Sequence, residues 1–489
     1  MCAIFGVNLN TGEDTGAAAV GVTYNGLLAL QHRGQEGAGI AVVNDNHIHY
    51  HKNVGLVAEV FTPEILQALP KGSVAVGHTR YSTTGGNRKE NVGPFVTDYL
   101  TGRIATAHNG NITNAREIRE YLRNCGLRFE ATNDSEVISQ LIGYCITKEG
   151  GTVRGTIKAA ECLRGAFSLI IASGKNKLIA VRDPDGFRPL CIGKNESGYA
   201  IASESCALDS CGFAFVRDVL PGEVVVIENG EIVYNDVKLS TKSNKGLCIF
   251  EYVYFARPDS IIDKLSVYEA RINMGATLAE EFPVDADIVC GVPDSGLDAA
   301  KGYSLRSGIP FASGFVKNRY IGRSFIYPDQ IQRDSAVRLK LNPLAASVKG
   351  KRIVLVDDSI VRGTTSEKIV RSLKNAGAVE VHMRISSPPF KFTCNYGTDI
   401  DEECNLIYNK MDRARQGSPA AATGFGAEPH LVDAIRQKIG ADSLGYISIE
   451  GLKKACAGSD MRFCTACFTG GNCAQKRRAF ARKNIFEEG

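Results

Sequence analysis

Residues 351–366 read KRIVLVDDSIVRGTTS, and this stretch decides the fold expected for the second part of the chain. Ile353–Val356 is a short apolar run, typical of a strand that is buried on both faces of a parallel sheet. Asp357 and Asp358 follow directly, and a hydroxyl-rich turn then leads into a helical pattern that ends at Gly377. This order places backbone N–H groups and a helix dipole around an anion. The sequence therefore predicts a ligand site at the carboxyl edge of an open α/β sheet.

The turn after the acidic pair indicates which anion is bound. Two acids after a strand can form an ordinary polar loop, but Asp-Asp-Ser-x-x-Arg-Gly-Thr-Thr resembles the loop with which type I phosphoribosyltransferases bind phosphoribosyl pyrophosphate (PRPP). The resemblance implies that the Gly-Thr-Thr turn holds the ribose 5-phosphate, while the acidic pair faces the ribose hydroxyls and Mg²⁺. The residues assigned to PRPP here are Asp357, Asp358, Ser359, Arg362, Gly363, Thr364 and Thr365.

Helical and apolar strand patterns alternate around this stretch, which predicts a doubly wound parallel sheet. The expected elements are a helix over 267–281 and strands over 287–292, 309–312, 353–356 and 379–385. Residues 292–296 (VPDSG) follow a strand and resemble the family's loop for pyrophosphate and metal. The resemblance implies that Ser295 contacts Mg²⁺ beside Asp357 and Asp358, a sparse set that suits an ion which keeps several waters.

A basic and aromatic segment lies between the second and third of these strand patterns. It runs over 317–326 and on to 338–342 and carries little regular pattern. We expect it to close over PRPP as a lid, with Lys317, Arg319 and Arg323 facing the phosphates. A solvated surface loop is the competing interpretation.

The composition of the whole chain is that of a globular protein with more than one domain. A chain of 489 residues is too long to fold around a single hydrophobic core. Contents of 44% apolar and 22% charged residues are ordinary for a globular protein. A net charge of +4 argues against an extended nucleic-acid surface. We read neither a signal peptide nor a membrane-length apolar run. Without export signals, the 15 cysteines favour thiols and metal ligands over disulfides, and a cytoplasmic location.

The first part of the chain has a different pattern, with many short strands punctuated by glycine. Helical patterns are fewer, the clearest covering 115–125 and 135–147, which indicates a β-rich layered α+β domain. The polar stretch 240–246 resembles a linker. We therefore expect one domain over 2–240 and a second over 247–489.

Cys2 is the candidate nucleophile of the first part. If Met1 is removed, Cys2 carries both a thiol and a free α-amine, and such an amine titrates near pH 7.7–8.0. The amine could then accept the thiol proton and deliver it to a leaving group, so no side-chain base would be needed. A Met-Cys start also occurs by chance, so the assignment of Cys2 as a nucleophile depends on the motifs that accompany it.

The context is a set of four motifs that occur in order. With Cys2 they resemble the class II glutamine amidotransferases, which are amino-terminal nucleophile (Ntn) hydrolases and have a four-layer αββα sandwich. The resemblance implies that Cys2 attacks the glutamine amide, that Asn109 and the N–H of Gly110 form the oxyanion hole, and that Arg80 and Asp134 bind the substrate α-carboxylate and α-ammonium. The motifs are QHRGQEGAG (31–39), GHTRYST (77–83), AHNGNI (107–112) and TNDSE (132–136).

Three neighbouring features are given structural roles. His78 and His108 flank motif residues, but a terminal amine already supplies a base, so we expect them to be hydrogen-bonded histidines behind the site. Residues 182–190 (RDPDGFRPL) are expected to form a turn between buried strands. Residues 401–437 are treated as an insertion without an assigned function.

The cysteines of the second part raise the question of a metal. The spacing Cys464-x-x-Cys467 suits zinc, an iron–sulfur cluster or two ordinary thiols. Residues 251–260 resemble the domain junction of the PRPP amidotransferase family. One branch of that family holds a [4Fe–4S] cluster, and the resemblance implies that it would serve here as a structural staple. The four matching cysteines are Cys248, Cys394, Cys464 and Cys467.

Together these resemblances imply a glycosyltransferase that makes ammonia from glutamine and uses it to displace pyrophosphate from PRPP, giving 5-phosphoribosylamine for purine synthesis. We expect a sealed path for ammonia between the sites, purine nucleotides as feedback inhibitors and a homotetramer, with no nucleic-acid or membrane partner. One rival is another class II amidotransferase, which the 353–366 loop disfavours. The other is a regulatory protein that senses PRPP without catalysis, which would predict a damaged glutamine site.

Overall fold

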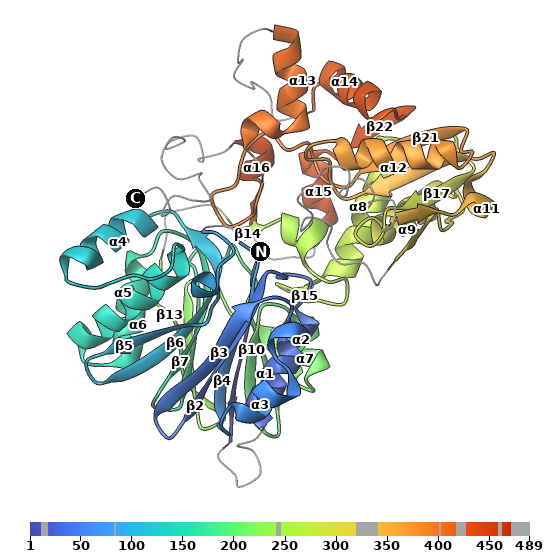
Figure 1. The fold of residues 1–489 in the computed structure, drawn as a ribbon. Helices are drawn as coiled ribbons and strands as arrows, with labels where there is room; N and C mark the ends of the chain where they lie inside the picture. The colour runs from blue at the N-terminus through green and yellow to red at the C-terminus, as the bar shows by residue number, and fades with distance from the viewer. Residues whose placement is uncertain are drawn as a thin grey trace.

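The computed structural model describes residues 1–10, 18–82, 85–240, 246–318, 341–400, 402–416, 427–457 and 462–470. Its first part, up to residue 240, is built on two antiparallel sheets that lie face to face (Figure 1). In spatial order, the seven-stranded sheet contains β11 (Ala214–Asp218), β9 (Cys191–Asn195), β10 (Gly198–Ala202), β1 (Ala3–Leu9), β4 (Val74–Arg80), β2 (Gly37–Asn44) and β3 (His47–Val54). The six-stranded sheet contains β13 (Glu231–Val237), β12 (Glu223–Glu228), β8 (Lys177–Arg182), β7 (Gly165–Ser173), β6 (Gly102–Ile112) and β5 (Phe95–Tyr99).

Alternation of side chains along each strand separates the layers of this part. In β1, Ile4 points into the core between the sheets, whereas Phe5 and Val7 pack under the outer helices. The seven-stranded sheet is covered by α1 (Ala18–Ala29), α2 (Val57–Val60), α3 (Pro63–Ala68) and α7 (Ser205–Ser210). The six-stranded sheet is covered by α4 (Ala115–Asn124), α5 (Asp134–Glu149) and α6 (Thr152–Cys162). The predicted four-layer αββα sandwich is confirmed.

The second part contains a sheet of four parallel strands. Their order is β17 (Ile288–Gly291), β20 (Arg352–Asp357), β21 (Glu380–Ile385) and β22 (Ser443–Tyr446). Val354 and Val356 of β20 pack on one face, under α8 (Val267–Glu281) and α9 (Leu297–Ser307). Ile353 and Leu355 pack on the opposite face, under α12 (Thr364–Asn375) and α14 (Pro429–Ile439). Helices on both faces confirm the predicted doubly wound sheet.

One sequence prediction for this part was wrong in detail, and a second region is more ordered than a loose segment would be. Residues 309–312 form no strand and make only a single bridge, between Val289 and Phe311. Pro310 has no N–H group to donate, so a continuous ladder cannot run through it. The stretch 401–437 is not only a loose insertion, because within its described residues α14 places Leu431 and Ile435 in the core of the sheet. A further helix, α13 (Ile407–Gln416), precedes α14.

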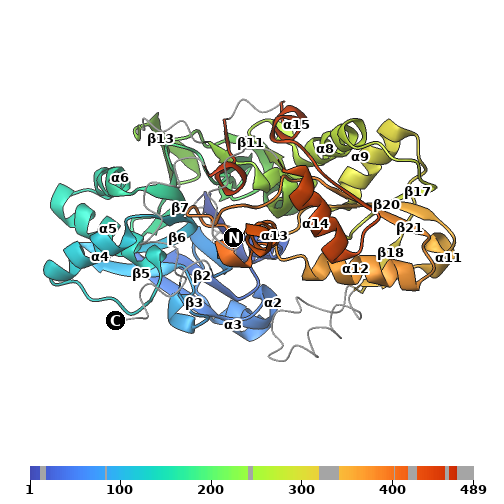
Figure 2. The same ribbon diagram turned by 90° about the horizontal axis from the view of Figure 1, so that it is seen from above.

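Short elements join the two parts, which lie side by side (Figures 1 and 2). The strand β14 (Leu247–Cys248) pairs in parallel with β23 (Phe463–Cys464), and α16 (Ala466–Thr469) follows at once. A π-helical turn, Glu251–Phe255, comes next after β14. The remaining small elements are β15 (Ile261–Ile262), β16 (Leu265–Ser266), β18 (Phe315–Lys317), β19 (Leu341–Pro343), α11 (Ala345–Val348) and α15 (Ile449–Ala455). Within the described ranges, no helix has the length and apolar character needed to cross a membrane.

Candidate active sites

Cys2 lies at the start of β1, beside the end of β4. Its Sγ atom is 3.5 Å from both the backbone nitrogen and the backbone oxygen of Tyr81. Burial raises the pKa of the Cys2 thiol, although the positive charges of the amino terminus and of Arg80 act in the opposite direction. Met1 is present in the structure, so the action of the Cys2 amine as a base stays a prediction.

The side chain of Asn109 is fully buried and, among the residues that the structure describes, has no hydrogen-bond partner. It stands on β6, and neither Oδ1 nor Nδ2 is hydrogen-bonded within the described residues. A buried amide left in this state costs free energy, so such groups are rare in folded proteins. The neighbouring Gly110 belongs to the same strand. An amide kept free in this way is suited to a ligand oxygen, which is the role predicted for Asn109.

Arg80 and Asp134 place opposite charges near the thiol. The charges of both side chains act on the pKa of Cys2, so both lie near its thiol. Arg80 ends β4 and donates to the carbonyl oxygens of Gly85 and Gly86 at 3.1 and 3.0 Å. Asp134 begins α5, and its Oδ2 accepts from the backbone N–H of Ile112 at 3.0 Å. A cation and an anion fixed in this way suit the two charged ends of an amino acid.

The two histidines beside these motifs are buried behind the site. His108 Nδ1 lies 3.0 Å from the hydroxyl of Ser135 and 3.9 Å from Oδ1 of Asp134. Burial lowers the pKa of His108, and burial together with the charge of Arg80 lowers the pKa of His78 to about 3. Neutral, buried rings agree with a supporting role. The expected hydrogen bond is found for Nδ1 of His108, whereas Nδ1 of His78 has no partner within the described residues.

The acidic pair at the end of β20 is buried, whereas the turn behind it is open. Burial and the charge of Asp358 raise the pKa of Asp357 well above its ordinary value. Burial also raises the pKa of Asp358, against hydrogen bonds that Ser295 and Ser359 donate to its carboxylate at 2.5 Å each. Ser295 thus lies beside the acidic pair, as predicted.

The turn itself presents the start of a helix to solvent. Gly363 caps α12 with a φ of +82°, a left-handed conformation that glycine adopts without strain. Arg362, Thr364 and Thr365 are exposed around it. The first N–H groups of a helix have no partner within the helix and favour an anion. The geometry of the predicted phosphate turn is therefore present.

The predicted lid is only partly described. Lys317 ends β18 and forms an ion pair with Asp294, next to Ser295. Register pairs Phe315 with Pro343 and Lys317 with Leu341, so the two ends of the segment lie together. Arg319 and Arg323 lie outside the described residues.

A cavity lies between the two sites and is lined by residues of both parts. Met1, Arg33 and Tyr81 line it from the glutamine side, and Ser359 and Val361 line it from the PRPP turn. The aromatic rings contributed by the connecting elements are Phe250, Tyr254, Phe255 and Phe390. The cavity therefore joins the neighbourhood of Cys2 to the acidic turn along a largely apolar wall.

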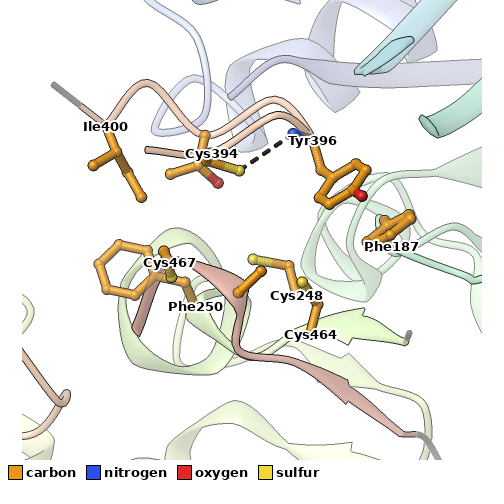
Figure 3. Close-up of a pocket in the computed structure, with 10 residues that line it drawn as sticks. Phe187, Cys248, Phe250, Cys394, Tyr396, Ile400, Cys464 and Cys467 are labelled. Carbon is orange, nitrogen blue, oxygen red and sulfur yellow. Dashed lines mark hydrogen bonds between the residues drawn. The ribbon is translucent and has the colours of Figure 1, made fainter. Parts of the chain in front are cut away.

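The four predicted cysteine ligands line one pocket, at the join between the two parts (Figure 3). Parallel pairing of β14 and β23 sets Cys248 opposite Cys464, and α16 supplies Cys467. Cys394 comes from a loop whose Tyr396 donates its N–H to the Cys394 sulfur at 3.3 Å. Aromatic and aliphatic side chains complete the lining.

The four cysteines give this pocket a set of possible thiolate ligands. Within the described residues, no three His, Cys, Asp or Glu side chains stand close enough to hold one metal ion. Four thiols are a donor set that both structural zinc sites and iron–sulfur clusters use. Burial raises the pKa of Cys248 to about 11, so in the absence of a metal the thiol form is favoured.

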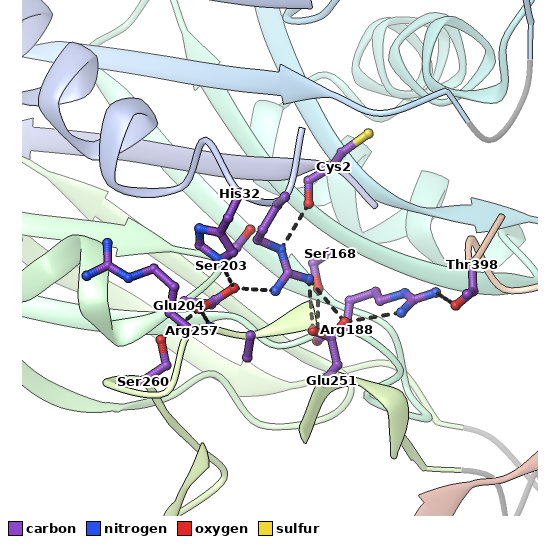
Figure 4. Close-up of polar contacts among 12 residues, drawn as sticks. Cys2, His32, Ser168, Arg188, Ser203, Glu204, Glu251, Arg257, Ser260 and Thr398 are labelled. Carbon is purple, nitrogen blue, oxygen red and sulfur yellow. Dashed lines mark hydrogen bonds and ion pairs between the residues drawn. The ribbon is translucent and has the colours of Figure 1, made fainter. Parts of the chain in front are cut away.

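A buried ion network was missed by sequence reasoning (Figure 4). Arg33 pairs with Glu204 of the first part and with Glu251 of the second, and Glu251 also pairs with Arg188. Burial opposes the charge of Glu204, but His32 and Arg33 outweigh it and hold its pKa well below the ordinary value. The sequence offered only a weak signal: RDPDGFRPL (182–190), expected to form a turn between buried strands, contains four charged residues.

Comparison with known proteins gives consistent similarities over both parts. A glutamine amidotransferase domain matches residues 78–210, and a phosphoribosyl transferase domain matches residues 268–386. Proteins named amidophosphoribosyltransferase from Archaeoglobus fulgidus and Methanocaldococcus jannaschii are each 46% identical to the chain, over 96% of its length and 97% of theirs.

Two solved structures share the whole fold. One is described as the glutamine PRPP amidotransferase from B. subtilis complexed with ADP and GMP, and it is 40% identical with a TM-score of 0.81 over 96% of both chains. The other is described as the allosteric regulatory enzyme of purine biosynthesis. It is 42% identical with a TM-score of 0.82, over 96% of this chain and 95% of that one.

Proposed function

The chain belongs to the amidophosphoribosyltransferases, and from this membership we infer that it takes ammonia from glutamine and transfers it to PRPP in the first step of purine biosynthesis. The observation that carries this conclusion is the cavity that joins the surroundings of Cys2 to the PRPP turn within one chain. Another class II amidotransferase would not need the acidic turn. A regulator without catalysis would need neither Cys2 nor a buried amide at Asn109 that has no hydrogen-bond partner within the described residues.

For the glutamine half-reaction, we propose that the Cys2 sulfur attacks the side-chain carboxamide. Arg80 and Asp134 hold the α-carboxylate and α-ammonium of the substrate. Asn109 Nδ2 and the N–H of Gly110 donate to the oxyanion, and preorganised donors of this kind supply the largest electrostatic contribution in acyl transfer. Once Met1 is removed, the amine of Cys2 would carry the thiol proton to the departing ammonia. Water then releases glutamate from the sulfur.

For the PRPP half-reaction, we propose that the turn fixes the substrate and leaves C1 open toward the cavity. The N-terminus of α12 and the Thr364 and Thr365 hydroxyls would hold the 5-phosphate, with Ser359, Arg362 and Gly363 shaping the turn. Lys317, and Arg319 outside the described residues, would face the pyrophosphate. Ammonia attacks C1 as the pyrophosphate oxygen leaves, giving 5-phosphoribosylamine.

We propose Ser295, Asp357 and Asp358 as the residues that hold Mg²⁺. The carboxylates and the hydroxyl lie together, and hard oxygen donors are what this ion prefers. When bound, Mg²⁺ would neutralise charge on the departing pyrophosphate. The buried acidic pair, with its raised pKa values, is the observation that supports a cation at this place.

We propose a [4Fe–4S] cluster for Cys248, Cys394, Cys464 and Cys467, which together line one pocket. When bound, it would hold the three connecting segments together. The same reasoning supports domains over 2–240 and 247–489, with the cluster at their junction. Purine nucleotides as feedback inhibitors are supported by the ADP and GMP in the B. subtilis relative, and the homotetramer is carried over from the family.

Two measurements test these proposals. Glutamate release should be faster with PRPP than without it and should vanish in Cys2→Ser. Equal turnover with and without PRPP, or full activity in the variant, would contradict the function. Protein purified without oxygen should be brown and contain iron and sulfide, whereas one zinc per chain would contradict the cluster.

A further inference from the structure

The side chain of Arg33 is hydrogen-bonded to the backbone of Cys2, the proposed nucleophile. Its Nε donates to the carbonyl oxygen of Cys2 at 3.2 Å. Its Nη1 lies 2.5 Å from Oε1 of Glu204, and its Nη2 lies 3.0 and 2.9 Å from the two carboxylate oxygens of Glu251. All three charged side chains are completely buried. The position of Cys2 thus depends on a carboxylate that belongs to the second part of the chain.

Glu251 is shared with a second buried guanidinium. Arg188 Nη1 donates to Glu251 Oε1 at 3.1 Å (Figure 4). The Nε and Nη2 atoms of Arg188 donate to the carbonyl oxygen of Tyr396 at 3.2 and 2.5 Å, and Nη2 also donates to the hydroxyl of Thr398 at 3.2 Å. An unbroken series of contacts therefore runs from the loop that carries Cys394 to the carbonyl of Cys2.

The same loop also touches the strand of the predicted oxyanion hole. Asn111 Nδ2 donates to the carbonyl oxygen of Asn395 at 3.0 Å. Gly397 has a φ of +92°, and a Cβ atom there would lie 2.8 Å from the backbone of Gly110. Only glycine allows this approach. The loop 394–398 thus reaches the glutamine site at two points, through Arg188 and through β6.

We propose that Glu251 and Arg188 are positioning residues, which hold Cys2 and β6 in their reactive arrangement from the cysteine-bearing loop 394–398. The inference rests on the proposed glutaminase activity and adds the part of the chain that maintains it. If one member of a buried ion pair moves away, its partner is left as an uncompensated charge in the interior, which costs much free energy. The members of the network are therefore expected to move together. Displacement of the loop is therefore transmitted to the nucleophile.

Glu251→Gln tests the proposal, because it keeps the shape of the side chain and removes its charge. Glutamine hydrolysis should fall about tenfold or more in kcat with little change in KM, since Arg80 and Asp134 still bind the substrate. Alkylation of Cys2 by iodoacetamide should slow in parallel. Synthesis of phosphoribosylamine from added ammonium and PRPP should stay unchanged, because it bypasses Cys2.

Asp263→Asn is the matched control. Asp263 forms a buried pair with Arg182 at 2.9 Å, also between the two parts, and among the described residues neither has a hydrogen bond or ion pair with Cys2 or Arg33. Arg182 Nε also donates to the carbonyl oxygen of Arg188 at 2.9 Å, but this bond involves the Arg188 backbone and not its guanidinium. Its φ of +44° is one that asparagine tolerates. The control should unfold at a lower temperature and keep its kcat. Equal losses of kcat in the two variants, or a loss in Glu251→Gln that extends to the ammonium reaction, would overturn the proposal.

Thr398→Val provides a second route if Glu251→Gln does not fold. It removes one hydrogen bond to Arg188 and should lower kcat about twofold to fivefold at constant KM. An unchanged kcat and alkylation rate would overturn the proposal. Absence of glutamine hydrolysis in the unmodified protein would instead contradict the proposed function itself, so the two failures are distinct.

Discussion

The glutamine site buries the groups with which it would recognise its substrate, whereas the PRPP turn leaves the side chains of Arg362, Thr364 and Thr365 exposed. Arg80, Asn109 and Asp134 are each less than 5% exposed, but Arg362 and Thr364 lie open to solvent. In the first site the free-energy cost of burying polar groups is incurred when the chain folds. In the second site it is incurred when the substrate binds. The difference indicates a preformed pocket for a small amino acid and an open cradle that is completed by its large anionic substrate.

Cys2→Ser should have the largest effect and should separate the two sites completely. The weaker nucleophile is expected to lower glutamine-dependent synthesis by about 10,000-fold or more, because one member of a catalytic unit accounts for most of its rate. Synthesis from added ammonium should stay near its normal rate. Measuring both rates on the same preparation checks this, and loss of both would mean that the sites are not separable.

Asp358→Asn should produce the reverse pattern. Loss of one buried carboxylate is expected to lower phosphoribosylamine formation by about 1,000-fold, since a bound metal stabilises the transition state by several kcal/mol. Glutamine hydrolysis without PRPP should persist, because Asp358 lies in the other part of the chain. If the rate of this basal hydrolysis fell as much as the rate of phosphoribosylamine formation, the two sites would not act independently.

Asn109→Ala tests whether the buried amide serves the transition state. We expect kcat for glutamine hydrolysis to fall by about 100-fold to 1,000-fold, as for other oxyanion donors, while KM changes little. An increase in KM alone would instead assign Asn109 to ground-state binding. Gain of stability without loss of rate would show that the unpartnered amide has no catalytic use.

Glu204→Gln tests how much a buried charged group on the glutamine side contributes to the free energy of unfolding. Removing one partner of the buried network should cost about 3 kcal/mol at pH 7. The pKa of Glu204 is held below its ordinary value in the folded state, so its contribution is present above about pH 4.3 and is lost as the pH falls further. Urea unfolding of both proteins from pH 7 down to about pH 2 would reveal a difference that shrinks below about pH 4, and a difference that grows with acid would contradict it.

Asp294→Asn tests the contribution of an exposed charged group on the PRPP side to the free energy of unfolding. We expect the smallest effect of the series here. Its ion pair with Lys317 is largely exposed, and exposed pairs contribute at most about 1 kcal/mol. We therefore expect a change of the free energy of unfolding close to zero, and less still in high salt. A cost as large as that of Glu204→Gln would remove the distinction between the two sites.

Sequence reasoning succeeded where chemistry and local structure coincide. The strand, acidic pair and turn of 353–366 are contiguous, so their geometry follows from short-range rules. The glutamine motifs were recognised as a set, although the residues lie on different strands. It failed at 309–312, where apolar residues predicted a strand and Pro310 prevents one.

Contacts between distant segments could not be predicted. Nothing in the surroundings of Arg33 indicates that Glu251 will face it, because the pairing depends on how the two parts pack. The same holds for Arg188, which belongs to a stretch expected to be only a turn. Charged residues in apolar surroundings indicate that a partner exists, but they do not identify it.

The pairing of β14 with β23 has a consequence for biosynthesis of the chain. Cys248 leaves the ribosome well before Cys464, and at ordinary elongation rates the interval is roughly 10 to 40 seconds. During that time the first part can fold, but the edge of Leu247–Cys248 has no strand beside it, and Cys248 and Cys394 are accessible to oxidants. The joint between the two parts can close only after translation has passed residue 464, so assembly of the cysteine pocket is a late step in the maturation of this protein.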